Sequence, residues 1–245
     1  MSTDKAYKLL ALQQGISNKK AKALIDQGVV YAGDRRVKIA RALMPETTQF
    51  RVEVPAEIAI VYQDDAIVAV NKPAFVDSYD IQDAIEGAEL LHRLDRQTSG
   101  VLLLGRDPAF VRRAVEAFRQ RKVTKHYVAW VEGVIYEPFE IDAPIHTIKQ
   151  GKAISRVDPK RGKPARTHVT PDEVQGKKSK VSITIDTGRT HQIRVHLAHV
   201  GHPVVGDEQY GSPTQAKRIL LHAASITLLG HTYTAPEPPD IQRYK

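Results

Sequence analysis

One short segment combines several side chains that could do chemistry. Residues 91–100 read LHRLDRQTSG, so the carboxylate of Asp95 lies in sequence between Arg93 and Arg96, close to His92. Positive charge nearby favours the ionised form of a carboxylate, and an ionised carboxylate can act as a nucleophile. The same residues are also compatible with a surface loop whose Asp forms a salt bridge. Spacing by itself leaves both interpretations open.

A group of histidines follows in the last third of the chain: His191, His196, His199 and His202. Imidazole is a common metal ligand. A helix over residues 190–200 would direct His191 and His196 to different faces, however, and the chain has no cysteine to assist. We therefore expect no metal. A metal-dependent hydrolase acting on RNA is the alternative that this cluster raises, and metal analysis of the purified protein would test it.

A run of basic residues lies between two expected strands: Lys149, Lys152, Arg156, Lys160, Arg161, Lys163 and Arg166. Two glycines and a proline interrupt it, which predicts a mobile loop. We expect this loop to contact the RNA backbone, with Lys160, Arg161 and Lys163 as candidates. Such contacts would set affinity rather than the choice of base.

The elements around residues 91–100 can be predicted from local pattern. Two β-rich runs, 58–62 and 66–70, flank a polar turn and predict a hairpin. The apolar run 101–104 predicts a buried strand directly after the reactive segment. Asp107 and Pro108 are typical of a helix start. The expected buried stripe of that helix consists of Val111, Ala114, Val115 and Phe118.

The second half of the chain continues the mixture of elements. Apolar residues alternate over 181–185, which predicts a half-buried strand, and a turn at 187–188 precedes a helix over 190–200 that Gly201 ends. The tail from Ala235 contains three prolines and should be irregular. Because helices and strands mix without a regular βαβ rhythm, we predict an α+β fold with a mixed, largely antiparallel sheet.

Residues 1–54 read as a small domain that precedes a larger one, 55–245. A helix over 7–14 ends at Gly15, and Ser17 can cap a second helix that ends near Gly28. Strands are expected at 29–31 and 50–54, with a turn at 33–34. The second helix carries Lys19, Lys20 and Lys22, which form either a solvated face or a phosphate-binding face.

Composition narrows the classes of partner. The chain has 245 residues, a formal charge of +8 and a pI of about 9.5, which favours binding to a polyanion such as nucleic acid. The absence of cysteine excludes disulfides and thiolate chemistry. We find no apolar run long enough for a membrane span and no secretory signal, and so expect a cytoplasmic protein.

Four segments together resemble one known family. The stretch 91–100 is similar to the HRLDxxTSG motif of the RluA-type RNA pseudouridine synthases. Asn71-Lys72-Pro73 is similar to the NKP motif of that family, and Lys125-His126-Tyr127 to its KxY element. Residues 188–197, 201–207 and 210–211 are similar to its third motif, and residues 4–54 resemble the S4 RNA-binding domain that many members carry. The resemblance therefore extends over nearly the whole chain and in the same order.

The resemblance implies a role for each matched residue. Asp95 corresponds to the catalytic carboxylate and Arg194 to the basic residue that pairs with it. Tyr127 corresponds to the aromatic residue that packs on the extracted uracil, and Arg93 to the residue that enters the vacated stack. The remaining matched positions, Ile193, Asn71, Lys72, Lys125 and His191, are expected to bind substrate.

The resemblance also implies the reaction and its partner. Uridine in structured RNA, with ribosomal RNA favoured over transfer RNA, would be isomerised to pseudouridine after the base has left the stack. No cofactor and no obligate protein partner are expected, and a monomer is the default. The alternative from another class is a noncatalytic RNA-binding or ribosome-assembly protein that keeps the fold.

One loop departs from the family pattern. After Pro73 the family usually has a glycine two positions on, whereas this chain reads AFVDSY over 74–79. The connection to His92 also appears shorter than usual. We expect this change to alter substrate selection rather than to abolish activity. In the S4-like segment, residues 40–48 lack the usual glycine-bearing turn.

Overall fold

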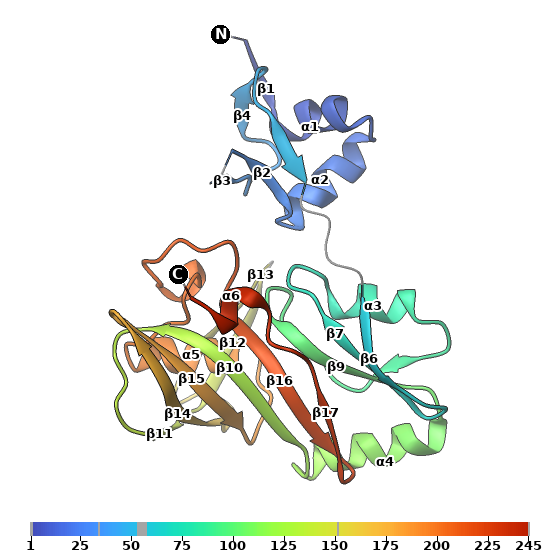
Figure 1. The fold of residues 1–245 in the computed structure, drawn as a ribbon, viewed down its shortest axis with the longest axis vertical. Coiled ribbons are helices and arrows are strands. Elements are labelled where there is room, and N and C mark those ends of the chain that lie inside the picture. Colours follow the sequence, from blue (N-terminus) through green and yellow to red (C-terminus); the bar gives the residue numbers. More distant parts are fainter. Residues whose placement is uncertain (1, 34, 53–57, 151, 245) are drawn as a thin grey trace. The chain divides into compact units, whose positions relative to one another are not determined.

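The computed structural model describes residues 2–33, 35–52, 58–150 and 152–244 (Figure 1). The chain forms two compact units, residues 1–57 and 58–245. In the described part of the chain, no helix combines the length and apolar character needed to span a bilayer.

The first unit contains the two expected helices. Helix α1 (Ala6–Gln14) ends at Gly15, whose φ of 62° is the left-handed conformation that glycine adopts readily. Helix α2 (Asn18–Asp26) is capped by Ser17, whose Oγ accepts a hydrogen bond from the Lys20 amide at 3.2 Å. Both predictions are confirmed.

Short strands complete the first unit. Strand β2 (Val30–Ala32) pairs with β3 (Arg35–Arg36) and β5 (Phe50–Val52), and β1 (Thr3–Lys5) pairs with β4 (Leu43–Pro45). The expected strands near 29–31 and 50–54 are therefore present. Residues 53–54 and position 34 of the expected turn lie outside the described residues.

The second unit is built on one ten-stranded sheet. In spatial order its main strands are β11 (Phe139–Asp142), β14 (Arg166–Gln175), β15 (Lys178–Ile185), β10 (Thr124–Glu132), β16 (Leu221–Leu228), β9 (Ser99–Gly105), β7 (Ile67–Lys72) and β6 (Ala59–Gln63). Beside these, β17 (His231–Thr234) pairs with β16, and β8 (Glu89–Leu90) with β9. Among the described strands, β9 and β16 pair in parallel and the other pairs of this sheet are antiparallel. The predicted α+β class with a mixed, largely antiparallel sheet is confirmed.

Helices cover both faces of this sheet (Figure 1). On one face, α3 (Ser78–Ala84) shares an apolar cluster with β7 and β9, and α5 (Gln192–His199) packs against β14. Helix α4 (Pro108–Arg119) packs on the opposite face of β7 and β9. All seven residues of β9 are consequently buried. A strand buried on both faces is apolar throughout, which is why residues 101–104 could be recognised in the sequence.

Two predicted helices differ in detail from the structure. The buried residues of α4 are Phe110, Ala114 and Ala117, whereas Val115 is 54% exposed, so the predicted stripe was rotated about the helix axis. Helix α5 begins at Gln192 rather than at 190 because His191 has a left-handed backbone, with φ of 56°. The tail, predicted to be irregular, contains the short helix α6 (Pro239–Gln242).

The predicted basic loop was wrong in its first part. Residues 145–157 form a hairpin of β12 (Ile145–Gln150) and β13 (Lys152–Val157), in which Ile148 pairs with Ile154 across the strands. The basic residues Lys149, Lys152 and Arg156 therefore belong to paired strands rather than to a mobile loop. A turn follows in which Asp158 accepts hydrogen bonds from the amides of Lys160 and Arg161, at 3.0 Å each.

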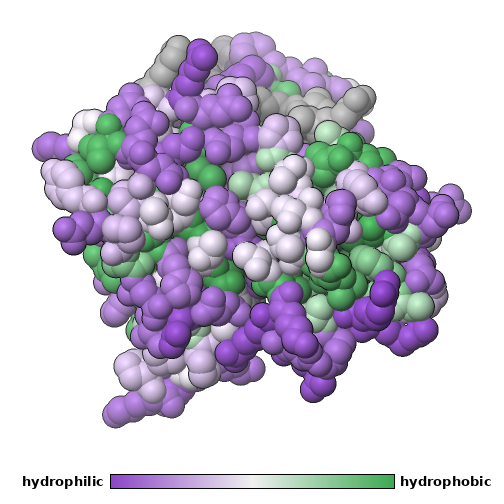
Figure 2. All heavy atoms as spheres, turned by 60° about the horizontal axis from the view of Figure 1, so that its bottom comes forward, coloured by the Kyte–Doolittle hydropathy of each residue, from purple (hydrophilic) through white to green (hydrophobic). Residues whose placement is uncertain are grey.

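The face of the molecule in Figure 2 is mostly hydrophilic, and its apolar residues gather in patches separated by polar ones. The exposed basic residues Lys160 and Arg161 belong to the turn after β13, and Lys163, also exposed, follows the turn and pairs with Ile145. The charge of Lys160 and Arg161 is therefore presented to solvent by a tight turn that Asp158 organises.

Candidate active site

A cleft of about 730 Å³ opens in the second unit. The loop between β8 and β9, strand β10 and the start of α5 all contribute to it. Its lining includes Arg93, Asp95, Phe118, Lys125, Tyr127, Arg189, His191, Ile193 and Arg194. Most of the residues that the sequence assigned to catalysis or substrate binding are thus brought to one place.

The loop that carries Asp95 is held on both sides of that residue. Before it, Leu94 exchanges two hydrogen bonds of 3.2 Å with the hydroxyl of Ser78. After it, the carbonyl of Arg96 accepts hydrogen bonds from the amide of Phe75 at 2.7 Å and from Lys72 Nζ at 3.2 Å. The segment 72–78 therefore positions the carboxylate.

Gly100 fixes where this loop enters the sheet. It has φ of 117° and lies at the parallel pairing of β9 with β16, opposite Ala223. A Cβ atom added at Gly100 would lie 2.1 Å from the Ala223 carbonyl oxygen, a distance that real Cβ atoms do not show. The final glycine of the reactive segment is therefore required for the close approach of two strands.

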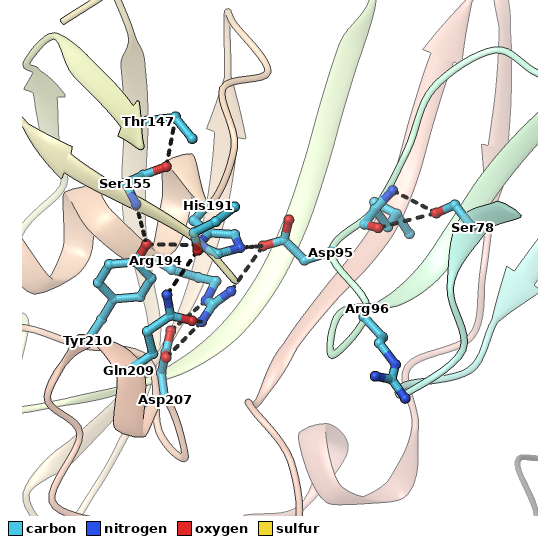
Figure 3. A network of polar contacts seen from close by, with 12 residues as sticks. Ser78, Asp95, Arg96, Thr147, Ser155, His191, Arg194, Asp207, Gln209 and Tyr210 are labelled. Atoms are coloured by element: carbon cyan, nitrogen blue, oxygen red, sulfur yellow. Dashed lines mark hydrogen bonds and ion pairs between the residues drawn. The ribbon is translucent and has the colours of Figure 1, made fainter. Parts of the chain in front are cut away.

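Asp95 is paired with a buried arginine. Arg194 Nη1 donates to Asp95 Oδ2 at 3.3 Å, and the same guanidinium donates to both carboxylate oxygens of Asp207 at 2.6 and 2.9 Å (Figure 3). Arg194 also donates to Gln209 Oε1 at 3.2 Å and lies over the ring of Tyr210. Its orientation is thus fixed from several sides.

These partners stabilise the charged form of Arg194. Burial of the side chain opposes its charge, but the hydrogen bonds and charge of Asp207, together with the charge of Asp95, raise the pKa of Arg194 above its ordinary value. A permanent positive charge therefore lies beside the carboxylate of Asp95, which is itself 26% exposed to the cleft.

The two arginines near Asp95 in sequence have hydrogen-bond partners of their own. Arg96 Nε donates to the carbonyl of Phe75 at 3.0 Å, and its side chain points away from Asp95 (Figure 3). Arg93 is exposed and its Nη1 lies 3.4 Å from the hydroxyl of Tyr79. The cation that pairs with Asp95 comes from a position 99 residues further along the chain.

His92 is also not a partner of Asp95. Its Nε2 accepts a hydrogen bond from the amide of Leu103 at 3.2 Å, and burial lowers its pKa to about 4. At neutral pH the imidazole is uncharged and ties the reactive loop to β9. The sequence suggested that Asp95 is surrounded by the charged side chains of residues 92–96. In the structure its hydrogen-bond partner is Arg194, from a distant part of the chain.

Tyr127 lies in the cleft because of an irregularity in β10. The register of β10 against β16 shifts between His126 and Tyr127, a bulge of the kind that redirects a side chain. Burial, aided by the charge of Asp95, raises the pKa of Tyr127 well above its ordinary value. The phenol is consequently protonated throughout the physiological pH range.

The expected substrate-binding residues divide into two groups. Lys125, His191 and Ile193 line the cleft. Asn71 is a half-buried residue of β7 that does not line it, and Lys72 is fully buried. The Nζ of Lys72 donates to the carbonyls of Pro73, Val76 and Arg96 at 3.0, 2.8 and 3.2 Å. The expectation that Lys72 contacts substrate is therefore corrected, because every proton of its ammonium group is used inside the fold.

Two other histidines of the cluster, His196 and His202, have structural contacts. His196 is buried between the Thr167 hydroxyl and the Ala143 carbonyl, at 2.9 and 2.8 Å. His202 Nδ1 lies 2.8 Å from the carbonyl oxygen of Glu132. Among the described residues, no group of His, Asp and Glu side chains is arranged to hold a metal ion.

Sequence reasoning assigned no role to Asp207 and Tyr210. Tyr210 is the last residue of the 3-10 helix η1 (Glu208–Tyr210), and Asp207 directly precedes that helix. Asp207 is 1% exposed, and burial of an unpaired carboxylate would be costly, so its pairing with Arg194 is expected once the fold is known. The sequence feature that could have identified them is their position in the matched segments 201–207 and 210–211.

Comparison with known proteins agrees with this site. A family model described as RNA pseudouridylate synthase matches residues 71–199. A protein of Helicobacter pylori named as an uncharacterized RNA pseudouridine synthase is 46% identical over 98% of this chain and 99% of its own length. The ribosomal large subunit pseudouridine synthase D of Haemophilus influenzae is 30% identical over 91% of this chain and 84% of its own.

A solved structure gives the same result. Human RNA pseudouridylate synthase domain containing 1 superposes with a TM-score of 0.65 and 30% identity, over 75% of this chain and 84% of that one. The fold and the cleft are those of an RNA-modifying isomerase. The chain belongs to the RNA pseudouridylate synthase family, whose members convert uridine into pseudouridine.

Proposed function

We propose that this enzyme isomerises uridine in ribosomal RNA, with Asp95 as its catalytic carboxylate. The N1–C1′ bond of the nucleoside breaks, the uracil turns within the cleft, and a C5–C1′ bond forms. C5 loses its proton and N1 gains one, so the atoms balance without an oxidant, a reductant or water. This chemistry calls for no cofactor.

The observation that carries the proposal is the pairing of Asp95 with Arg194 inside the cleft. A buried, permanently charged guanidinium lies beside the carboxylate that would act as nucleophile or base. The carboxylate is still partly exposed, so a nucleotide can reach it.

Two further residues fit the handling of an extracted base. Tyr127 offers an aromatic ring in the cleft, and such rings stack on bases with little dependence on their identity. Arg93 is exposed beside Asp95 and its guanidinium lies over the ring of Tyr79, 5.7 Å from the centroid. It can therefore move into the space that the uracil leaves in the RNA stack.

Basic residues around the cleft account for RNA binding. Arg189 and Lys125 line the cleft and also a neighbouring hollow with Arg119 and Arg121, which lie at the end of α4 and just after it. Further exposed basic side chains lie in the turn after β13 and directly behind it: Lys160, Arg161 and Lys163. Contacts of this kind bind phosphate without reading sequence.

We also propose that residues 1–54 act as an S4-like RNA-binding domain. Support comes from α2, where Lys19 and Lys20 are exposed and Lys22 lies over the ring of Tyr7. If this face binds phosphate, replacing Lys19 and Lys20 by alanine should reduce the slope of RNA affinity against salt concentration. An unchanged slope would assign these lysines to a solvated face.

Ribosomal RNA is favoured because the Haemophilus influenzae relative is named a ribosomal large subunit pseudouridine synthase. The test is to map pseudouridine in ribosomal and transfer RNA from cells that lack the protein, and from cells that express wild type or Asp95→Asn. We expect the loss of one or a few ribosomal sites, restored by the wild type alone.

A matched control is Asp83→Asn, which changes an exposed carboxylate of α3 outside the cleft and should restore every site. Loss of sites in transfer RNA would redirect the proposal to that substrate. If all sites persist without the protein, or if Asp95→Asn restores them, the catalytic proposal is wrong and a noncatalytic RNA-binding role takes its place.

A further inference from the structure

Behind the pairing of Asp95 and Arg194 lies a second chain of contacts to the same carboxylate (Figure 3). The amide of Ser155 donates to the hydroxyl oxygen of Tyr210 at 3.0 Å. That hydroxyl lies 2.8 Å from His191 Nδ1. The other ring nitrogen of His191, Nε2, lies 3.9 Å from Asp95 Oδ2.

The first donor favours one direction for the hydrogen bonds that follow it. A backbone amide can donate but not accept, so Tyr210 must accept from Ser155. Its own proton is then available for the partner on its other side, which is His191 Nδ1. A neutral imidazole that accepts at Nδ1 carries its proton on Nε2. The N–H of His191 is therefore directed towards Asp95.

Local surroundings keep this imidazole neutral. Burial lowers the pKa of His191, and the positive charge of Arg194 acts in the same direction, whereas Asp95 and Asp207 oppose the decrease. The side chain is 14% exposed and its ring is edge-on to that of Tyr210. Its backbone is left-handed, with φ of 56°, a conformation that residues other than glycine adopt at some energetic cost.

We propose that His191 is a positioning residue that donates its Nε2–H to Asp95 Oδ2 and thereby selects Oδ1 as the reacting oxygen. Oδ2 already accepts from Arg194 Nη1 at 3.3 Å. Within the described part of the chain, the contacts of this carboxylate to Arg194 and His191 both fall on Oδ2, and Oδ1 points away from them (Figure 3). Closing the 3.9 Å gap by about 1 Å brings the His191–Asp95 pair to hydrogen-bond distance.

The proposal deepens the function proposed above and rests on it, but its first test does not require turnover. In protein labelled with ¹⁵N at histidine, ring-nitrogen chemical shifts at neutral pH should identify His191 as the neutral Nε2–H tautomer. Tyr210→Phe removes the hydroxyl proton that fixes this tautomer, so the variant should show a mixture. A wild-type signal from the Nδ1–H tautomer, or from imidazolium, would overturn the proposal.

The second test compares two amides at position 191. The nitrogen of a glutamine side chain can take the place of imidazole Nε2, whereas the shorter asparagine side chain ends near the position of Nδ1. Asparagine tolerates a left-handed backbone better than glutamine does. If His191 served the backbone alone, His191→Asn would be the milder change. If its Nε2–H orients Asp95, His191→Gln would be the milder one.

We expect the kcat of His191→Asn to fall about 10- to 100-fold, as when one hydrogen bond to a charged group is lost. His191→Gln should retain most of the kcat, and KM for RNA should change little in both. His199→Gln, which changes the exposed histidine at the other end of α5, is the matched control. Equal kcat losses in the two variants, or a larger loss in His191→Gln, would refute the positioning role. An inactive wild type would instead count against the proposed function, because the tautomer would remain as measured.

Discussion

Arg194 contacts two carboxylates, and it is held more closely by Asp207 than by Asp95. Both oxygens of Asp207 accept from the guanidinium, at 2.6 and 2.9 Å, whereas Asp95 accepts at 3.3 Å. Asp207 is 1% exposed and Asp95 is 26% exposed. The buried carboxylate thus aims the guanidinium, and the exposed one remains available to a nucleotide.

Replacing Asp207 by asparagine should impair both stability and catalysis. The buried guanidinium would lose its charged partner, which should lower the free energy of unfolding by about 3 kcal/mol. The kcat should fall while RNA affinity is kept, because Arg194 would no longer be aimed at Asp95. Urea unfolding and single-turnover kinetics measure the two effects.

Asp240→Asn provides the control for Asp207→Asn. Asp240 also accepts two hydrogen bonds from one arginine, Arg218, at 2.7 Å each, but it lies outside the cleft and is 46% exposed. The kcat of Asp240→Asn should therefore match that of the wild type. A similar loss of kcat in both variants would mean that Asp207 acts through general stability.

Lys72 should make the stability of the protein depend on pH in the alkaline range. Burial lowers its pKa from 10.5 to about 7 in the folded chain. Between these values the unfolded chain binds more protons than the folded chain, so the stability contributed by this group rises as pH increases from about 7 towards 10.5. Below pH 7 both states hold the proton and the contribution is at its lowest.

The measurement is urea unfolding of wild type and Lys72→Met at pH 7 and pH 9. The wild type should gain stability relative to the variant at the higher pH. Lys72→Met should also lower kcat, because the loop of Asp95 loses a hydrogen-bond donor at the Arg96 carbonyl. A stability difference that is the same at both pH values would argue against titration of Lys72 in this range.

The contributions of the Tyr127 ring and of its hydroxyl to kcat/KM should be separable by substitution. Tyr127→Phe keeps the stacking surface, whereas Tyr127→Leu removes it, and stacking of a base on an aromatic ring contributes about 1–3 kcal/mol. We therefore expect kcat/KM for Tyr127→Leu to be at least about 5-fold below that for Tyr127→Phe. Because the pKa of Tyr127 is raised, the ratio of wild type to Tyr127→Phe should stay constant between pH 6 and pH 9. A ratio that changes across this range would show that the phenol titrates there.

Gly100 and Gly87 form a matched pair for testing the strand approach. Both have positive φ, 117° and 71°, but a Cβ at Gly87 meets no atom within 4 Å whereas one at Gly100 meets the Ala223 carbonyl. Gly87→Ala should cost about 1 kcal/mol, the strain of a left-handed backbone. Gly100→Ala should cost clearly more, about 3 kcal/mol or greater, because a clash is added. If thermal unfolding showed equal losses of stability in the two variants, β9 and β16 would be able to separate at little cost in free energy.

The sequence by itself determined the local elements and the chemistry of the family. Helix caps such as Ser17 and Asp107 act between near neighbours, so their patterns were sufficient. The wholly buried strand β9 is visible as an apolar run because both of its faces are covered. The order of the matched motifs indicated Asp95 as the candidate carboxylate, although the partners of that carboxylate could not be read from the sequence.

Tertiary structure decided which residues surround Asp95. Its nearest charges in sequence, Arg93 and Arg96, are directed elsewhere, and its cation comes from α5, whose position is set by packing against the sheet. The burial of Lys72, the bulge before Tyr127 and the pairing of Asp207 with Arg194 have the same origin. Each depends on contacts between segments far apart in the chain. The burial of a side chain and the charges around it depend on its position in space. The sequence gives the residue types without those positions.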